Sequence, residues 1–456
     1  MNNSSDSDRL GGRQLSRRGF IERSGGVLAG TAAVAAGFPF VLTSHAAPDD
    51  PIRIGVIGCG GRGTGAVLDA LGAATKVIYP SAGYHTEDVA QTGPIQDKTI
   101  QVVALADVFQ DRLNTCREQL SRLDIKIPDD HCFVGFDAYQ KLLAIQEINY
   151  VILTTPPHFR PAHLKAAIEA GKHAFVEKPV AVDAPGVRMV MEAGKLAKER
   201  GLGIAAGTQR RHMRGYGETI KRIQDGMIGD VLTCRAFWNG GVIWVVERKE
   251  GWSDMEWQLR NWNYFTWLGG DHIVEQHVHN LDVIHWVMGG PPVKAYGVGG
   301  RQARPNKNFG HIYDHFSIEY EYANGARIYS QCRQMDGCEG RVEEGVVGTK
   351  GSSNCANWIK VRGGEVWRYR EPEASPYQQE HRDLIASIRA GSPINEAQNV
   401  AESTMTGIMG REAAYSGQVV EWEKAIASEQ RWGPTTYAFG DLPFPDVPMP
   451  GKYKFV

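Results

Sequence analysis

Short apolar runs alternate with segments of helical spacing between residues 52 and 176. Runs of strand length rich in β-branched residues are typical of buried strands. They predict strands at 52–57, 102–106, around Phe133, at 150–154 and at 173–176. The intervening segments predict helices at 64–74, 111–122, 137–145 and 161–170. Strands that alternate with helices form a parallel, doubly wound sheet, so this region is predicted to be an α/β domain.

The pattern changes after Pro179. A helix at 184–200 and a short strand at 203–206 precede longer alternating runs at 231–238, 294–298, 315–322, 326–332 and 341–348. One helical segment, 277–288, interrupts these runs, and two further helices are predicted at 377–390 and 398–415. Successive strands without crossover helices favour an antiparallel sheet. We therefore predict a first domain at 51–180 and a second, α+β domain with a mostly antiparallel sheet at 181–456.

The N-terminus has the order of a secretion signal. Arg17 and Arg18 precede an uncharged stretch rich in Gly and Ala at 25–42, and small residues follow at 44–46. This order resembles a twin-arginine signal, which we place at 1–46. The alternative is a membrane anchor, although so many Gly and Ala residues make a poor spanning helix. We expect a periplasmic or otherwise exported protein that uses the twin-arginine export machinery and has no stable membrane span after processing.

Composition and charge narrow the class of protein. The chain has 456 residues, of which 42% are hydrophobic and 22% charged, as in soluble proteins of two domains. A formal net charge of −2 argues against nucleic acid as the main partner, because phosphate binding needs a basic face. The seven cysteines include no C-x-x-C pair, which argues against a disulfide framework. Cys332 and Cys338 could still pair in an oxidising compartment.

A glycine-rich turn, Gly58-Cys59-Gly60-Gly61-Arg62-Gly63, joins the first predicted strand to the first predicted helix. In a G-x-G-x-x-G turn the glycines let a pyrophosphate approach the backbone at the helix N-terminus. Asp107 closes the second strand, where a carboxylate can bind both hydroxyls of an adenosine ribose and repels a 2′-phosphate. The turn and this carboxylate predict a bound NAD rather than NADP. A glycine turn without a ligand is the alternative.

Two later strands end in residues that would reach the same cleft. Thr155, Pro156 and His158 follow the strand at 150–154, and Glu177-Lys178 follows the strand at 173–176. Ligands of doubly wound sheets bind at the carboxyl ends of the strands. A lysine beside a glutamate can donate a hydrogen bond to a substrate hydroxyl, or act as a base if its pKa is lowered. Taken alone, the Glu-Lys-Pro triplet is better explained as a surface salt bridge.

The segment 269–282, GGDHIVEQHVHNLD, is rich in titratable residues. If residues 274–288 form one helix, Glu275, His279 and Asp282 share a face and His277 lies around the cylinder. A carboxylate one turn from an imidazole fixes its tautomer and raises its pKa, which favours proton transfer. The spacing differs from the zinc motif H-E-x-x-H. A bound metal and a structural polar cluster remain alternatives.

Upstream of this segment lies a run of tryptophans: 238, 244, 252, 257, 262 and 267. Flat indoles such as that of Trp262 could cover the apolar face of a sugar ring. Tryptophans also build cores and subunit contacts, so both interpretations stay open. Gln209 and Arg210 follow the strand at 203–206 and are expected to line the cleft. The basic residues there could bind an acidic substrate or form a salt bridge with a neighbouring chain.

The motifs in their order resemble a known family. I-G-V-I-G-C-G-G-R-G, A-L-A-D-V, T-T-P-P-H, V-E-K-P and a late G-G-x(8)-H-x-x-D are similar to those of the Gfo/Idh/MocA oxidoreductases. The resemblance implies a Rossmann domain, a second domain with a large open sheet, and NAD(P)-linked oxidation or reduction of a sugar or polyol. It also implies that Lys178 contacts the reacting hydroxyl and that His279 is the acid/base. Family members commonly have Asp where Glu275 stands and a small residue where His277 stands.

The expected site residues fall into three groups. The catalytic group is Lys178, His279 and Glu275. The cofactor group is Gly58, Cys59, Gly60, Arg62, Gly63, Asp107, Thr155, Pro156, His158, Glu177 and Gln209. The substrate group is Lys178, Arg210, Trp262, His277, His279 and Asp282, and no metal ligand is predicted.

Three functions remain open at this stage. The first is an exported NAD(P)-dependent dehydrogenase, acting on a carbohydrate or cyclitol, with a tightly bound NAD and a dimeric or tetrameric assembly. The second is an enzyme that returns its hydride within one cycle, either between two sugars or as an NAD-recycling glycosidase that works by transient oxidation and elimination. The third is a non-catalytic sugar-binding protein.

Overall fold

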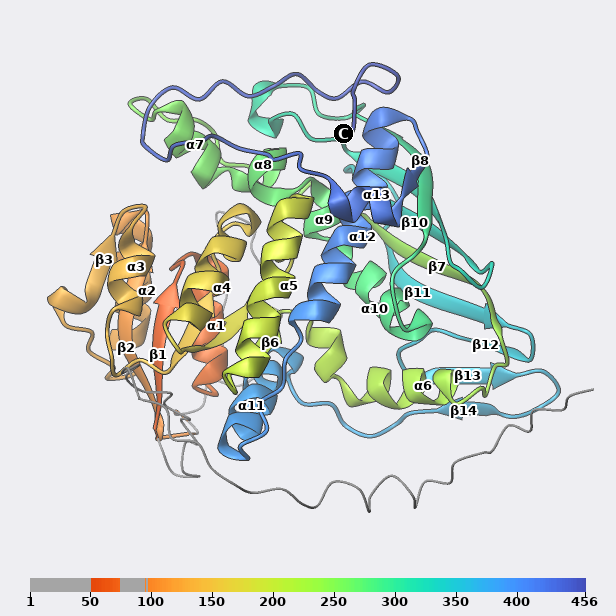
Figure 1. Cartoon of the computed structure of the whole chain (residues 1–456), viewed down its shortest axis with the longest axis horizontal. Coiled ribbons are helices and arrows are strands. Elements are labelled where there is room, and N and C mark those ends of the chain that lie inside the picture. The colour runs from red at the N-terminus through yellow and green to blue at the C-terminus, as the bar shows by residue number, and fades with distance from the viewer. Residues whose placement is uncertain (1–50, 74–94, 96) are drawn as a thin grey trace, which may run out of the picture. The chain divides into compact units, whose positions relative to one another are not determined.

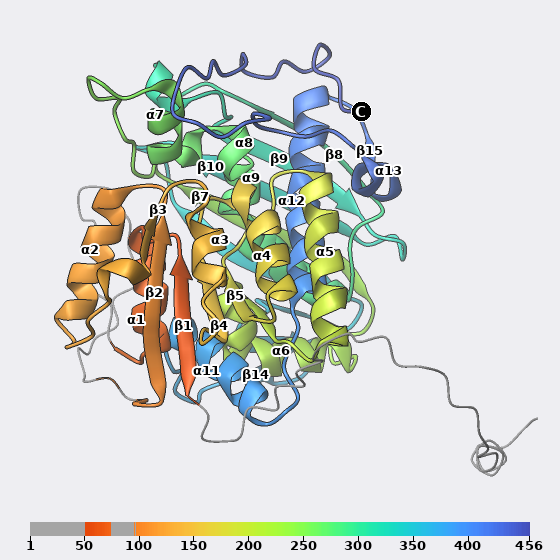
Figure 2. The same cartoon turned by 60° about the vertical axis from the view of Figure 1, so that its left-hand side comes forward.

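The computed structural model describes residues 51–73, 95 and 97–456. The predicted signal at 1–46 lies outside the described residues, as does nearly all of the stretch 77–98 that separates the first two strands. Two sheets organise the described chain, and Figures 1 and 2 show them side by side with helices α5 and α12 between them. Helix α5 spans Ala184–Glu199, and α12 spans Ala397–Ser416.

The first sheet is fully parallel, as predicted. Its strand order is β3-β2-β1-β4-β5-β6, with neighbours paired in parallel throughout. The strands are β1 Ile52–Ile57, β2 Ile100–Asp107, β3 Cys132–Val134, β4 Tyr150–Leu153, β5 His173–Val176 and β6 Ile204–Ala206. Because β6 pairs with β5, the parallel sheet extends past the boundary that the sequence placed at residue 180.

Helices pack on both faces of this sheet because its strands are apolar on both faces. Strands β4 and β5 are buried at every position. The helices of this region are α1 Gly61–Ala70, α2 Gln110–Ser121, α3 Ala138–Leu143 and α4 Arg160–Glu169, with short 3₁₀ turns at Asp129–His131 and Pro157–Phe159. All four predicted helices are therefore present, and their boundaries differ from the prediction by a few residues.

The second sheet has nine strands in the order β14-β13-β12-β11-β7-β10-β9-β8-β15. Strands β7 and β10 are parallel and every other neighbouring pair is antiparallel, which confirms the mostly antiparallel prediction. The strands are β7 Val231–Gly240, β8 Lys294–Gly300, β9 His315–Glu321, β10 Arg327–Gln334, β11 Arg341–Gly348, β12 Gly351–Ser353, β13 Trp358–Val361, β14 Val366–Arg368 and β15 Val420–Glu421.

Helices α10 and α12 cover one face of the second sheet (Figure 1). On the other face Tyr296 and Tyr329 lie in register with Glu319 between them, and both rings are about half exposed. The remaining helices are α6 Arg214–Gln224, α7 Asp254–Arg260, α8 Thr266–Gly269, α9 His272–Glu275, α10 Val278–Met288, α11 Pro376–Arg389 and α13 Trp422–Ala427, with 3₁₀ turns at Gln209–His212, Trp262–Tyr264 and Lys307–Phe309. More helices thus separate β7 from β8 than the single segment predicted.

The chain returns to the first sheet near its end. Helix α11 packs against α1 and β6, and Figures 1 and 2 show it beneath the parallel strands. Leu384, Ile385 and Ile388 enter the core that β1, β2 and α1 build on one face of the sheet. The Tyr150 hydroxyl of β4 also lies 2.9 Å from His381 Nδ1. The core on one face of the parallel sheet is therefore completed by residues from a distant part of the sequence.

His212 joins the end of the first domain to α11. Its ring is 5% exposed and contacts Asp383 at 2.7 Å and Glu396 at 3.4 Å. Burial lowers the pKa of His212, but the two carboxylates outweigh burial and raise it to about 10. A raised pKa stabilises the fold fully below the unfolded value of about 6.5, and this contribution is lost as pH rises through about 10.

We therefore expect the stability difference between wild-type protein and a His212→Gln variant to be largest near pH 6.5. It should shrink steadily as pH rises toward 10. Urea unfolding of both proteins across this range measures the difference. Two curves that run parallel over the whole range would contradict this role of His212.

One further expectation from the sequence concerns the cysteines. Cys332 is buried and Cys338 exposed, and both are free, so they do not form the disulfide that the sequence allowed. Among the described residues no helix is both long and apolar enough to span a bilayer.

Candidate active site

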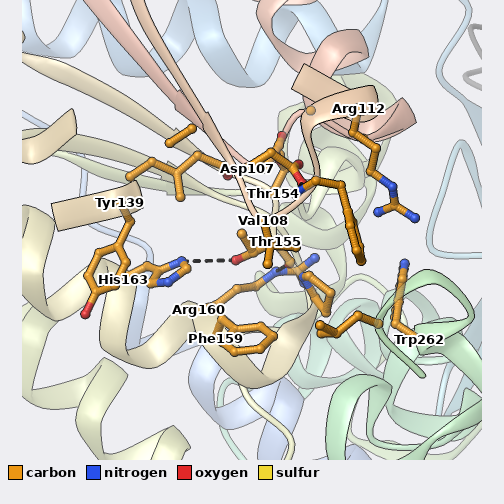
Figure 3. Close-up of a pocket in the computed structure, with 18 of the residues that line it drawn as sticks. Asp107, Val108, Arg112, Tyr139, Thr154, Thr155, Phe159, Arg160, His163 and Trp262 are labelled. Atoms are coloured by element: carbon orange, nitrogen blue, oxygen red, sulfur yellow. Dashed lines mark hydrogen bonds between the residues drawn. The ribbon is translucent and has the colours of Figure 1, made fainter. Parts of the chain in front are cut away.

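A pocket of about 520 Å³ lies at the carboxyl ends of strands β1, β2, β4 and β5. This is the edge at which doubly wound sheets bind their ligands. Figure 3 shows Thr155, Phe159 and His163 on one side of the pocket, with Arg112 and Trp262 on the other. Most of the predicted cofactor residues line it, namely Gly58, Gly60, Arg62, Gly63, Asp107, Thr155, Pro156, His158 and Glu177.

The glycine turn lines the pocket and leaves no room for a side chain at Gly58 or Gly63. Gly58 has φ +98°, a backbone conformation that favours glycine. A Cβ on Gly63 would lie 1.8 Å from the Gly58 carbonyl oxygen, so this position admits only glycine. A Cβ on Gly60 would face the pocket and meet only Arg112, at 3.6 Å. This cradle before α1 fits the pyrophosphate of a dinucleotide.

Asp107 ends β2 beside this turn. Its carboxylate accepts the backbone N–H groups of Cys59 at 2.6 Å and of Phe109 at 2.8 Å. Burial raises the pKa of Asp107, and the nearby Arg112 guanidinium partly offsets this effect. Cys59 is fully buried and contributes only its backbone to this contact. Arg112 lines the same pocket and was not among the residues picked out from the sequence.

Arg62 links the glycine turn to three carboxylates. It pairs with Asp69 at 3.1 Å, with Glu380 of α11 at 2.9 Å, and with Glu177 at the end of β5. Burial raises the pKa of Glu177, but Arg62, Arg160 and Lys178 together lower it. Glu177 is 5% exposed, so the Glu-Lys-Pro triplet is not the surface salt bridge that it suggested when taken alone. It is instead a buried link between β5 and the cofactor turn.

Lys178 extends from the end of β5 toward the second domain. Its Nζ donates to the Glu275 carboxylate at 2.9 Å and to the Glu275 carbonyl oxygen at 2.5 Å. The two side chains are only 12% and 13% exposed, and both residues line the pocket. A partly buried amine that keeps a hydrogen-bond donor near a cofactor can stabilise a developing alkoxide. The structure thus brings together two of the three predicted catalytic residues.

The predicted contact between Glu275 and His279 is not formed. The segment is two helices, α9 ending at Glu275 and α10 beginning at Val278. The His277 N–H bonds to the His272 carbonyl five residues back, and the His279 N–H bonds to the Gln276 carbonyl three residues back. These bonds depart from the i to i+4 pattern of an α-helix. Glu275 and His279 therefore do not lie on one face of a continuous helix. Glu275 pairs with Lys178 instead.

His279 stacks on Trp238, with ring centroids 5.7 Å apart and planes at 24°. Burial lowers its pKa well below the usual range, and the positive charges of Lys178, Arg210 and Arg62 lower it further. This corrects the prediction that a carboxylate raises the pKa of His279. The imidazole is neutral at pH 7 and can accept a proton. His279 does not line the pocket, although the charge of the pocket-lining Lys178 acts on its ring.

Four other predicted residues do not reach the pocket. His277 is fully buried and lies 2.7 Å from the Ser330 hydroxyl. Asp282 is 1% exposed and bonds to Arg211 at 2.9 Å and to Ser403. Arg210 forms an ion pair with Glu344. Gln209 is likewise absent from the pocket lining. None of these four side chains lines the pocket, so the structure does not support them as substrate-binding or cofactor-binding residues there.

An aromatic wall closes the side of the pocket opposite the first sheet. Trp244 and Trp262 stand 5.7 Å apart between ring centroids, and both line the pocket with Val246 and Leu259. Trp262 therefore lies where a substrate-binding residue was predicted. No group of three or more potential metal-binding side chains is found in 51–73, 95 and 97–456.

The glycine cradle, the carboxylate at the end of β2 and the lysine at the end of β5 define a dinucleotide-binding protein of the Rossmann class. Family profiles then place the chain. Residues 52–208 match the oxidoreductase family with an NAD-binding Rossmann fold, and residues 217–354 match the GFO/IDH/MocA C-terminal domain. The chain belongs to the Gfo/Idh/MocA family of oxidoreductases.

Individual relatives are distant. An inositol 2-dehydrogenase of Gluconacetobacter diazotrophicus is 28% identical over 307 residues, 64% of this chain and 80% of the relative. A 2,7-anhydro-N-acetylneuraminate hydratase of Escherichia coli is 26% identical over 192 residues, 42% of this chain and 47% of the relative. The chain spans about half the length of the first curated relatives it matches, 46% and 47%.

A solved structure shares the fold at low identity. It is a scyllo-inositol dehydrogenase from Lactobacillus casei with bound NAD(H) and scyllo-inositol. The TM-score is 0.59 at 17% identity, over 82% of this chain and 99% of the other. This similarity supports the fold alone.

Proposed function

We propose that this protein transfers a hydride between NAD and a CH–OH group of a sugar, a cyclitol or a glycoside. The observation that carries the proposal is the Lys178–Glu275 pair, which joins the two domains on the wall of the pocket that contains the glycine cradle. Support also comes from the inositol 2-dehydrogenase relative. A protein that only binds sugar needs no buried lysine beside a dinucleotide cradle.

The side chains divide the work in the oxidation direction. NAD supplies the hydride acceptor when it is bound. Lys178 donates a hydrogen bond to the substrate oxygen and stabilises the negative charge that develops there. His279 is neutral because of burial and its cationic neighbours, and we assign it the hydroxyl proton as a weak base, since the same surroundings oppose protonation of its ring. Glu275 holds the Lys178 ammonium in place through its carboxylate and its backbone carbonyl.

The choice of NAD over NADP rests on Asp107. Its buried carboxylate would accept the ribose hydroxyls and repel a 2′-phosphate. Arg112 lies at the same end of the pocket and acts in the opposite sense, since a guanidinium attracts a phosphate. We propose NAD because Asp107 is fixed by two backbone N–H groups next to the glycine turn.

A second candidate is an enzyme that returns its hydride within one cycle. The relative named as a 2,7-anhydro-N-acetylneuraminate hydratase supports it, because the name hydratase denotes the addition of water. On a glycoside, oxidation of one hydroxyl to a ketone would pass a hydride to NAD and make the C–H next to the ketone acidic. Loss of that proton to a base would form a carbon–carbon double bond and expel the aglycone, which would leave with its bonding electrons and take up a proton. Water would then add, and the hydride would return to the ketone. Export, proposed from the sequence, would favour such a closed cycle.

One experiment separates these candidates. Purified protein is examined by native mass spectrometry and then incubated with cyclitols, sugars and glycosides, with and without added NAD. We expect the protein to bind NAD and to form NADH with at least one polyol or sugar. Release of an aglycone without net NADH would select the closed cycle. Failure to bind any dinucleotide would refute both.

Assembly and location are proposed on separate grounds. Within the part of the chain that the structure describes, the face of the second sheet that carries Tyr296 and Tyr329 is exposed. We propose that this face packs against a second copy in a homo-dimer or homo-tetramer. We also propose that the chain is exported through the twin-arginine machinery, on the basis of Arg17-Arg18 and the apolar stretch that follows.

A further inference from the structure

The chain ends in a strap without helix or strand, residues 428–456, which follows α13. In Figure 1 this last, dark blue segment runs past α8 to α7 and then back toward the C-terminus. The strap lies outside both stretches that match the family, 52–208 and 217–354. Its contacts are therefore a feature of this chain that the family comparison does not explain.

Two hydrogen bonds from backbone groups of the strap hold it in place, one at Trp432 and one at Gly440. The Trp432 N–H donates to Asp183 at the start of α5 at 3.0 Å. The Gly440 carbonyl accepts the Met255 N–H of α7 at 3.1 Å. Between these two points the strap crosses from the first domain to the second. Residues 433–439 are thereby held over the loop that follows β4.

Tyr437 is the part of the strap that enters the dinucleotide pocket. Its hydroxyl lies 2.7 Å from His158 Nε2. Burial lowers the pKa of His158 to about 4, so the ring is neutral at pH 7. The Tyr437 ring also packs on Phe136 at 6.0 Å and on Phe159 at 5.3 Å between centroids.

Phe439 and Tyr437 both pack on the ring of Phe136. The ring centroid of Phe439 is 6.0 Å from that of Phe109 and 5.3 Å from that of Phe136. Phe109 comes two residues after Asp107, and its N–H bonds the Asp107 carboxylate. The strap therefore contacts the loops after β2, β3 and β4, which surround the end of the pocket beyond the glycine turn. Tyr437 remains 41% exposed and Phe439 50%, so apolar ring surface is left for a further partner.

We propose that Tyr437 and Phe439 form part of the dinucleotide site, as a wall over its adenosine half that slows release of the cofactor. The inference rests on the proposed NAD function. If the pyrophosphate lies on the glycine turn and Asp107 binds the ribose, the adenine falls among Val108, Phe136 and Phe159, where Tyr437 packs. Release of the cofactor then requires the strap to lift and its aromatic contacts to break.

The test measures release rather than turnover. Full-length protein is loaded with radiolabelled NAD and diluted into excess unlabelled NAD, and the label that stays bound is followed by filter binding. The double variant Tyr437→Ala/Phe439→Ala should release NAD about tenfold faster or more, since it loses several aromatic contacts. Tyr437→Phe keeps the ring and loses only the hydrogen bond to His158, so it should release NAD a few-fold faster.

Met449→Ala is the matched control, because Met449 is a large apolar side chain of the same strap, 57% exposed and outside the pocket lining. Its release rate should equal that of the wild type. Equal release rates for all four proteins would overturn the role of the strap and leave the NAD function standing. Failure of the wild type to bind labelled NAD would instead refute the proposed function itself. Unchanged circular dichroism of the double variant shows that faster release is not caused by unfolding.

Discussion

A Lys178→Met variant is expected to lose roughly a thousandfold in turnover while it still binds NAD. Methionine keeps much of the length of the side chain but cannot donate a hydrogen bond to the substrate oxygen. The Lys178 ammonium is also the partner of Glu275, whose side chain is only 13% exposed. Loss of the amine therefore removes charge stabilisation at the reacting oxygen. The measurement is steady-state turnover with the substrate found in the screen, together with NAD titration.

Lys165→Met is the matched control for this variant. Lys165 is a half-exposed lysine of α4 that faces Glu169 at 3.9 Å and lies outside the pocket lining. Its loss should leave turnover near the wild-type value. If Lys178→Met retained near-normal turnover with NAD bound, the assignment of Lys178 as the oxyanion partner would be wrong. If it failed to bind NAD, the residue would serve the cofactor rather than the reaction.

Arg411→Met is expected to be the most destabilising single substitution that we consider. Arg411 of α12 is 1% exposed and pairs with the Glu412 carboxylate at 2.6 Å. It also donates to the carbonyl oxygens of Val182 at 2.9 Å and Gly270 at 3.0 Å. Methionine would leave a buried carboxylate and two carbonyl oxygens without this partner. Breaking one side of a buried ion pair costs about 3–5 kcal/mol in unfolding free energy.

Chemical denaturation of the variant and of wild type gives this difference directly. Arg122→Met is the control, because Arg122 follows α2, far from the second sheet in the sequence, and its pair with Glu118 is solvent-exposed. It should change stability far less than Arg411→Met. Equal losses in the two variants would show that the Arg411 pair contributes no more than a surface pair.

The local signals in the sequence were sufficient for the strands and helices of the first sheet and for the cofactor turn. Apolar runs at 52–57 and 150–154 predict strands because parallel strands are buried on both faces. The glycine turn is recognisable because its backbone conformation and close approach restrict Gly58 and Gly63 to glycine. Asp107 and Lys178 could be placed at the site because each follows a strand at the edge where ligands bind. These residues depend mainly on nearby sequence.

Helical phase was the weak point of the prediction. The interpretation of Glu275, His279 and Asp282 as one face assumed an unbroken helix, and backbone bonds at His277 and His279 break it. The sequence predicted a raised pKa for His279, whereas burial lowers it. No pattern of residue types encodes such a break, because it depends on what packs around residues 276 and 277.

Two pocket residues could have been predicted and were missed. Arg112 and Phe159 follow predicted strands, so the rule that finds Asp107 could have found them too.

Contacts between distant parts of the chain could not be predicted from local sequence. Tyr437 carries no such signal, because nothing in the sequence around it indicates that it packs on the loop after β4. The same holds for α11, which was predicted as a helix without any indication that it belongs to the first sheet.

Because α11 packs on the first sheet, the core of that sheet cannot be completed until α11 has been synthesised. A ribosome that has made residues 52–208 has made every strand of the parallel sheet, yet one face of that sheet still lacks Leu384, Ile385 and Ile388. Arg62 at the cofactor turn still lacks Glu380. Because domains emerge from the N-terminus first, the cofactor domain must wait for most of the chain before its core can close. A chain cut short before residue 376 would therefore lose the finished cofactor site together with the missing segment, so only nearly full-length molecules would hold the dinucleotide.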